Sequence, residues 1–244
     1  MSDEQVCALV GTVGGAGTTR LALEFAATLG RDGRSAVVVD AGYATQGLAT
    51  AVPGRVDADL TAAVTEDRPL SGAVHGLDLP VAGRVAAAPA RAPFERLSRA
   101  KTSECARRLA ERLATAAQTF DHVVVDVPPV ATNPSVAAVT AADRVVLVTP
   151  DSQRGADALP RSRDRLADVD AAVDAVVVNR AGDRRVEDAD ARVPTAGTTA
   201  LPEAPTVVDD AGFATAVADA VETALAVDLD PVDDSSSLTD YFPG

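Results

Sequence analysis

Short runs of apolar residues, most of them valine, alternate along the chain with longer stretches in which apolar residues recur every three or four positions. Continuous apolar runs are typical of strands buried on both faces of a parallel sheet, and the longer periodic stretches are typical of helices that cover such a sheet. The alternation therefore predicts one doubly wound α/β domain, with a mainly parallel sheet and helices on both faces. We place this domain at residues 1–227.

The expected strands are residues 6–10, 36–39, 84–88, 122–126, 145–149, 175–179 and a short last strand at 207–208. The expected helices are residues 18–31, one long helix over 94–119, an Arg/Asp-rich helix between 149 and 175, and residues 212–227. The strand at 122–126 is the clearest, because it is entirely valine between its polar ends. Residues 228–244 are rich in Asp, Ser and Pro, a composition that predicts an acidic, disordered tail.

The amino-acid composition indicates the solvent to which the protein is adapted more than the partners that it binds. The net charge is −14, and of 36 acidic residues 27 are Asp, whereas 21 of 22 basic residues are Arg and Lys101 is the only lysine. This profile resembles that of salt-in halophiles, in whose cytoplasm the Debye length falls to about 3 Å. We interpret the acidity as an adaptation to solvent. No apolar run approaches the roughly 18 residues of a membrane span, and the polar, acidic start is unlike a secretory signal, so we expect a cytoplasmic protein.

The cysteines and histidines offer no metal-binding spacing. Cys7 lies in a valine-rich run and Cys105 in a helical stretch, while His75 and His122 are isolated from both and from each other. We therefore expect no zinc site.

A glycine-rich loop follows the first expected strand, with the sequence GTVGGAGTTR over residues 11–20. Small residues let backbone N–H groups approach an anion at a helix N-terminus. Gly17 and Thr19 fit the general P-loop pattern, but Thr18 stands where its lysine belongs and Thr12 where its first glycine belongs. Two other interpretations remain open here. Gly11, Gly14 and Gly17 with Asp40 fit a dinucleotide-binding loop, and a tight turn without a ligand fits as well.

A second motif lies in residues 120–129, FDHVVVDVPP, where a buried strand ends in Asp126 and a Pro-Pro turn. A carboxylate at the carboxyl end of a strand beside a P-loop is what a Walker-B magnesium site requires.

With these motifs, the sequence over residues 6–226 resembles the ParA/MinD family of deviant Walker-A ATPases. Residues 14–19 are similar to its phosphate loop, 37–41 to the strand entering its first switch, 120–129 to its Walker-B strand, 142–149 to its next strand, 176–180 to the strand with its adenine-reading Asn, and 201–203 to the loop closing over the base. A dehydrogenase is disfavoured, since no Tyr stands four residues before Lys101.

The resemblance implies roles for individual residues. The nucleotide would be bound by Gly14, Gly15, Gly17, Thr18, Thr19, Asn179 and Pro202; magnesium would be held through water by Thr19 and Asp126; and Asp40 and Asp126 are the candidate catalytic carboxylates.

The chain departs from the family at its charged positions. Val13 and Thr18 replace the two signature lysines, and Gly42 replaces an acid of the first switch. Arg20 is the nearest substitute cation, but a helical residue at that position should point along the helix. Each lost charge-assisted hydrogen bond lowers affinity by about 10- to 150-fold, and transition-state cations are worth about 10³ to 10⁵ in rate. We expect ATP or ADP with Mg²⁺ to bind weakly, if at all, with little or no hydrolysis.

Charge also limits the partners. Residues 193–244 contain no Lys or Arg and ten acids, which disfavours binding to membranes and nucleic acid through this part. Residues 84–112 are the exception, with eight basic and three acidic residues, a local charge of +5. This stretch is either a solvated helix face with internal pairs such as Glu104 with Arg108, or a docking patch for an acidic protein.

These observations favour a ParA/MinD-like regulatory or scaffold protein that acts through a protein partner in spatial positioning, with a homodimer as a further assembly to consider. One alternative is an active ATP-dependent dimerisation switch, with cations from Arg20 or a partner chain. Another is a structural interaction module with an empty site.

Overall fold

The computed structural model describes residues 5–184 and 186–231, and the expected tail lies outside the described residues from position 232 onward. One sheet of eight strands forms the centre of the molecule, in the order β3-β4-β2-β5-β1-β6-β7-β8. Its strands are β1 (Val6–Gly11), β2 (Ser35–Asp40), β3 (His75–Leu77), β4 (Arg84–Ala88), β5 (His122–Val127), β6 (Arg144–Pro150), β7 (Ala175–Ala181) and β8 (Ala191–Pro194). All neighbouring strands are parallel except the β3–β4 pair at one edge.

Helices and short 3-10 turns connect the strands. The helices are α1 (Thr18–Arg31), α2 (Leu60–Thr65), α3 (Phe94–Ala100), α4 (Ser103–Ala117), α5 (Asn133–Thr140), α6 (Gln153–Ala167) and α7 (Ala211–Leu225). The 3-10 turns are η1 (Leu48–Thr50), η2 (Leu70–Ala73) and η3 (Leu201–Glu203).

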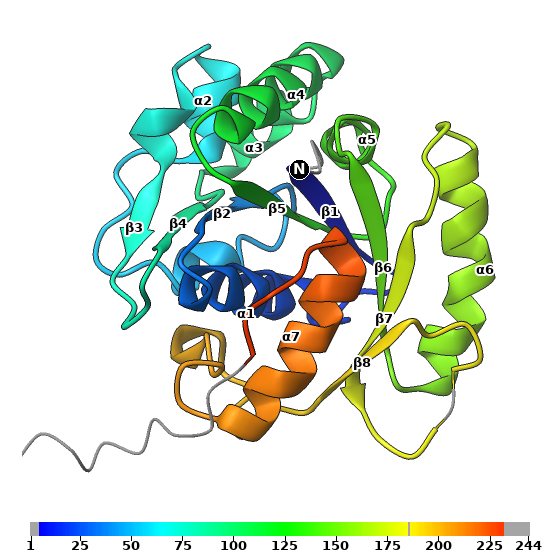
Figure 1. Cartoon of the computed structure of the whole chain (residues 1–244). Helices are drawn as coiled ribbons and strands as arrows, with labels where there is room; N and C mark the ends of the chain where they lie inside the picture. Colours follow the sequence, from blue (N-terminus) through cyan, green and yellow to red (C-terminus); the bar gives the residue numbers. More distant parts are fainter. Residues whose placement is uncertain (1–4, 185, 232–244) are drawn as a thin grey trace, which may run out of the picture.

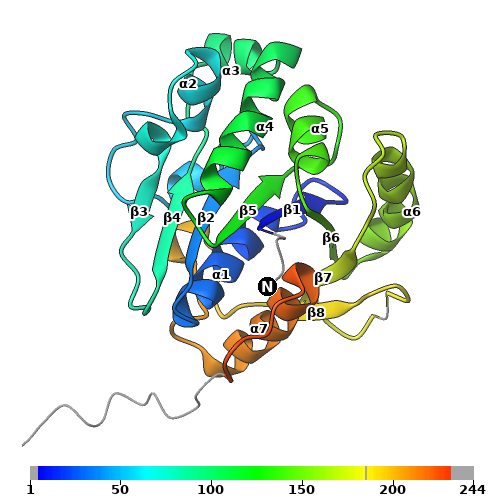
Figure 2. The same cartoon turned by 45° about the horizontal axis from the view of Figure 1, so that its top comes forward.

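The helices form one layer on each face of the sheet (Figures 1 and 2). Helices α1 and α7 pack on one face, and α2 to α6 pack on the other, so that two apolar cores flank the strands. Strand β1 shows how the sequence divides between them. Val6, Ala8 and Val10 face the α2–α6 core, while Cys7 and Leu9 face α1 and α7. The doubly wound, mainly parallel α/β fold expected from the sequence is confirmed.

Two sequence predictions were wrong. The long helix expected at 94–119 is divided into α3 and α4, because the Thr102 side chain accepts a hydrogen bond from the Cys105 backbone N–H and so caps a new helix. The strand expected at 207–208 is a turn, and the last strand is β8 instead. A Val-Val pair is too short to distinguish a strand from a buried turn, and Val207 is indeed buried.

The strand order places the loop after β1 at the centre of the sheet. Strand β1 lies between β5 and β6, so the chain leaves β1 toward α1 beside the carboxyl end of β5. Open α/β sheets bind ligands at this edge, where the strand order reverses. No helix within the described ranges is both long and apolar enough to span a membrane.

Candidate functional site

The glycine loop has the geometry of an anion cradle. Gly15 and Gly17 adopt positive φ angles of 81° and 88°, and Gly17 is the N-cap of α1. No side chain caps this helix, so the N–H groups of its first turn have no partner within the helix. A Cβ at Gly17 would lie 2.4 Å from the Asn179 side-chain nitrogen. Both the backbone angle and the close approach of β7 therefore require glycine at this position.

Thr19 and Asp126 meet at the inner end of the loop. The Thr19 hydroxyl donates a hydrogen bond of 2.5 Å to Asp126 Oδ2. Asp126 is 3% exposed near the carboxyl end of β5. Hydroxyl and carboxylate oxygens are the donors that Mg²⁺ prefers, so this pair fits the metal position implied by the resemblance.

Asp40 lies beside Asp126, because the two residues pair in register between β2 and β5. Its side chain is fully buried and accepts hydrogen bonds from the backbone N–H groups of Gly42 (2.8 Å) and Ala90 (3.3 Å). Burial and the neighbouring Asp126 raise the pKa of Asp40 to about 8, and burial raises the pKa of Asp126. Two buried carboxyl groups thus stand together, and no salt bridge in the described part of the chain involves either.

Arg20 does not bring a cation to this pair. Its guanidinium donates to the Ala200 carbonyl (3.0 Å) and to the Thr206 hydroxyl, and forms an ion pair with Glu24 at 3.2 Å. Glu24 in turn is 1% exposed and accepts hydrogen bonds from the backbone N–H groups of Thr206 and Val207. Arg20 therefore points along α1 and ties the segment before α7 to this helix, as expected for its place in the helix.

The predicted base-binding residues lie on the other side of the loop. A pocket of about 190 Å³ opens beside Gly17, Thr19 and Asn179, and Leu201 on η3 forms part of its wall. Pro202 is exposed on the same turn. The Asn179 amide donates to the Ala16 carbonyl at 2.9 Å and its oxygen accepts from Arg180 N–H at 2.9 Å, so Asn179 fastens the loop to β7.

Sequence reasoning missed Arg180. This residue has a positive φ of 55° where the pairing of β7 with β8 shifts register, and its guanidinium donates to the Gly15 carbonyl at 3.3 Å. Arg180, and not Arg20, is thus the arginine that contacts the glycine loop. The sequence carried only one signal, its position directly after Asn179.

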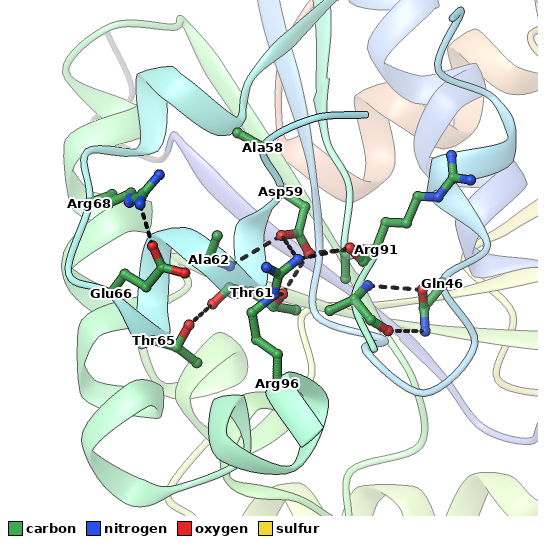
Figure 3. Close-up of polar contacts among 12 residues, drawn as sticks. Gln46, Ala58, Asp59, Thr61, Ala62, Thr65, Glu66, Arg68, Arg91 and Arg96 are labelled. Carbon is green, nitrogen blue, oxygen red and sulfur yellow. Dashed lines mark hydrogen bonds and ion pairs between the residues drawn. The ribbon is translucent and has the colours of Figure 1, made fainter. Parts of the chain in front are cut away.

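The basic stretch of residues 84–112 is largely neutralised within the chain. The expected Glu104–Arg108 pair is confirmed at 2.6 Å, and Arg107 pairs with Glu111. Arg112 pairs with Asp67 at 2.6 Å. Figure 3 shows Arg96 reaching Asp59, with 2.9 Å between its guanidinium and Asp59 Oδ1. Arg84 lies over the Phe120 ring, 4.3 Å from its centroid.

The other residues considered for metal binding lie apart from the site. Both cysteines are buried and free. His75 contacts the Ala58 carbonyl, and His122 contacts Arg34 at the opposite edge of the sheet. Among the described residues, no group of three or more His, Cys, Asp or Glu side chains could hold a metal ion.

Comparison with known proteins agrees with the fold and the loop. A model of the AAA domain family AAA_31 matches residues 4–161. The cell division ATPase MinD from Pyrococcus furiosus is similar, with a TM-score of 0.77 and 20% identity over 90% of this chain and 98% of that chain. MinD from Pyrococcus horikoshii, solved with Mg-ADP, has a TM-score of 0.76 and 19% identity over 89% and 94%. A ParA family ATPase from Chlorobium tepidum has a TM-score of 0.73 and 18% identity over 90% of this chain and 98% of that chain.

A search of curated proteins returned no match to this sequence. The family model nevertheless spans more than half of the chain and includes β1, the glycine loop, Asp40 and the Asp126 strand. The chain therefore belongs to the AAA_31 family of AAA domains, with the fold of the MinD and ParA ATPases, and the expected resemblance to the ParA/MinD family is confirmed.

Proposed function

We propose that the chain is a ParA/MinD-like nucleotide-site protein with a degenerate Walker A loop. It binds ATP or ADP weakly, hydrolyses ATP slowly or not at all, and serves as a regulatory or scaffold protein in spatial organisation through a protein partner. The spatial role rests on the family alone. The chemical part rests on the residues of the site.

One observation carries the proposal: the loop keeps its shape while its charged positions are neutral. Gly15 and Gly17 hold the backbone angles of the cradle, and Asp126 meets Thr19 at its inner end. Val13 and Thr18 stand where the family has lysines, and Arg20 is held by Glu24 and the loop at 200–206. The groups that bind phosphate through backbone dipoles are retained, whereas those that stabilise developing charge are absent from these positions.

The residues fit a magnesium nucleotide in their chemistry. Thr19 and Asp126 supply oxygen donors, and a divalent cation beside Asp40 and Asp126 would favour the ionised form of these two carboxyl groups, whose pKa values are raised by burial. When bound, Mg²⁺ would offset the negative charge of the nucleotide phosphates. The MinD from Pyrococcus horikoshii holds Mg-ADP, which supports the same ligand here. The pocket beside Gly17 and Asn179 is the natural place for the base.

Titration of the purified full chain with fluorescently labelled ATP and ADP, with and without Mg²⁺, tests the proposal. The expected result is Mg²⁺-dependent binding weaker than micromolar, with ATP turnover at least about a thousandfold below that of an intact family member measured in parallel. Tight binding with ordinary turnover would support the active switch instead. Absence of binding at millimolar nucleotide would support the structural module with an empty site.

A further inference from the structure

The α3 surface is a candidate interaction site that the nucleotide chemistry does not use. We define this surface by Arg91, Phe94 and Lys101. Phe94 is 84% exposed and is the large hydrophobic side chain that stands out on the described surface. Phe94 and Lys101 are two turns apart and so lie on one side of α3, and Arg91 precedes Phe94 by three residues.

The two cations of the α3 surface differ from most other cations of the same basic stretch, and Arg99 on α3 is, like them, unpaired among the described residues. Within residues 5–184 and 186–231, the side chains of Arg91 and Lys101 make no hydrogen bond or ion pair, whereas Arg96, Arg108 and Arg112 are all paired. Figure 3 shows the Arg91 side chain directed away from Asp59, although its backbone N–H donates to that carboxylate at 2.7 Å. Free positive charge beside an exposed aromatic ring is thus concentrated here, on a protein whose net charge is −14.

Hydrogen bonds connect the α3 surface to both loops that follow the site carboxylates. The segment before α3 donates from Ala90 N–H to Asp40, and Ala92 exchanges two hydrogen bonds of 3.2 and 3.3 Å with the Gln46 side chain (Figure 3). At the other end, the Lys101 carbonyl accepts from the Asn133 side chain at 3.0 Å. The two ends of α3 are therefore hydrogen-bonded to Gln46 and Asp40 after β2 and to Asn133 after β5.

The sequence itself contains a segment of matching chemistry. Residues 232–244 carry Asp233, Asp234 and Asp240 with Tyr241 and Phe242, and no Lys or Arg. These two aromatic residues are part of only seven in the whole chain. Acidic groups match the free cations, and an aromatic pair matches Phe94, because aromatic rings pack favourably edge to face or offset.

The position of the last described residues favours a contact between two copies. Asp230 N–H donates to Asp32 at 2.8 Å and Arg34 donates to the Asp228 carbonyl, so the chain arrives at position 231 next to the amino end of β2. Helix α3 follows the carboxyl end of β4, at the opposite edge of the parallel strands. We propose that residues 232–244 of one copy dock on the α3 surface of a second copy, through Tyr241 and Phe242 against Phe94 and through the aspartates against Arg91 and Lys101.

This contact is heterologous, so it predicts open chains of copies and not closed dimers. It is independent of nucleotide binding, and its test needs no nucleotide. Mass is measured by light scattering and sedimentation of the full chain over a concentration series. We expect mass to rise with concentration. Phe94→Ser, and separately the double variant Tyr241→Ser with Phe242→Ser, should each weaken association by about tenfold or more. Arg107→Gln and Ser235→Ala are matched controls expected to associate like the wild type.

Mixing the two defective variants provides the decisive arm. The Phe94→Ser protein keeps an intact segment 232–244, and the double variant keeps an intact α3 surface, so a one-to-one mixture should form pairs and stop there. Phe94 is exposed, so its variant should keep the wild-type circular dichroism spectrum and melting temperature. A wild-type chain that stays monomeric at every concentration overturns the proposal, whether the segment is free or docks within its own copy. A mixture that forms no pairs overturns it as well.

Discussion

Two buried carboxyl groups at the same edge of the sheet, Asp59 and Asp40, have opposite surroundings. Asp59 is 2% exposed and caps α2 through the Ala62 N–H, accepts from the Thr61 hydroxyl and the Arg91 N–H, and pairs with the Arg96 guanidinium. Asp40 is fully buried with two backbone donors and faces a second carboxyl group, Asp126, across the β2–β5 pairing.

Under the proposed function, the difference separates a structural carboxylate, Asp59, from one that lies beside a bound cation, Asp40. The chain supplies a cation for Asp59, so its charge is balanced when the protein folds. For Asp40 the chain supplies a like charge, which with burial raises its pKa to about 8. Burying a like-charged pair costs free energy of folding, and a bound cation would offset that cost. The carboxyl pair of the site therefore lacks the cation partner that Asp59 has, and a bound cation would supply one.

The largest expected effect concerns the pH dependence of stability, measured by urea unfolding in EDTA. Between about pH 4 and pH 8 the folded protein keeps a proton on Asp40 that the unfolded chain releases. Stability should then fall as pH rises through this range, by up to about 1.4 kcal/mol per pH unit, and level off above pH 8. Asp40→Asn should reduce this slope, and the raised pKa of Asp126 accounts for the part that remains.

A control carboxyl group lies at the other edge of the sheet. The pKa of Asp121 is lowered by hydrogen bonds from Ser35, so this carboxylate stabilises the fold at all pH values above its unfolded pKa. Asp121→Asn should therefore lower stability by a constant amount above about pH 5 and leave the slope in that range as in the wild type. An Asp40→Asn protein with the wild-type slope would mean that the carboxyl pair does not hold an extra proton.

Next in size is the loss of the cation at Asp59. Arg96→Met removes the guanidinium and leaves a buried carboxylate without its charge partner. Unpairing a buried charge costs about 3–5 kcal/mol, and we expect about 2–3 because Arg96 is itself 27% exposed. Arg107→Met, which breaks the exposed pair with Glu111, should change unfolding free energy by less than about 0.5 kcal/mol. Equal losses in the two variants would contradict the structural role of Asp59.

Asp40 and Asp126, the carboxyl groups of the proposed site, were easier to place from the sequence than the structural carboxylate Asp59. Asp126 ends a run of three valines and precedes a Pro-Pro turn, and Asp40 ends another valine run, so both could be placed at strand ends on pattern alone. Asp59 lies in a stretch without periodicity, and its cation is 37 residues away in the chain. Pairing at that distance is decided by how α2 and α3 pack, which local pattern does not contain.

The same limit explains what was missed around the loop. The glycine spacing predicted the cradle and the start of α1 at Thr18, which the structure has at that residue. The contact of Arg180 with the Gly15 carbonyl depends on the positive φ at Arg180 and the register shift between β7 and β8. Neither feature has a signature in residue type, since arginine is not favoured in that conformation.

A lysine in the glycine loop would give the Asp40–Asp126 pair a nearby cation, as Arg96 gives one to Asp59. Thr18→Lys places an ammonium group on the first residue of α1, directly before Thr19, which hydrogen-bonds Asp126. ATP affinity should rise by about 10- to 150-fold, the value of one charge-assisted hydrogen bond. Thr140→Lys adds the same charge at the exposed end of α5 and should leave affinity unchanged. Fluorescence titration measures both, and equal gains would point to non-specific attraction.

The smallest expected effect is that of Arg180→Gln on ATP affinity. This variant tests whether Arg180 takes the place of the lysines that, under the proposed function, the loop has lost. Arg180 is exposed and its guanidinium donates to the Gly15 carbonyl, and in the described part of the chain it forms no hydrogen bond or ion pair with Asp40 or Asp126. Arg180→Gln should therefore weaken ATP binding by only about two- to fivefold, the value of about 0.5–1 kcal/mol for one hydrogen bond. Arg184→Gln, which loses a contact with Gln153 away from the loop, is the matched control. A loss of a hundredfold or more for Arg180→Gln would mean that the arginine turns inward onto phosphate when nucleotide binds. The contrast with Asp59 would then disappear, because the site would have its own cation after all.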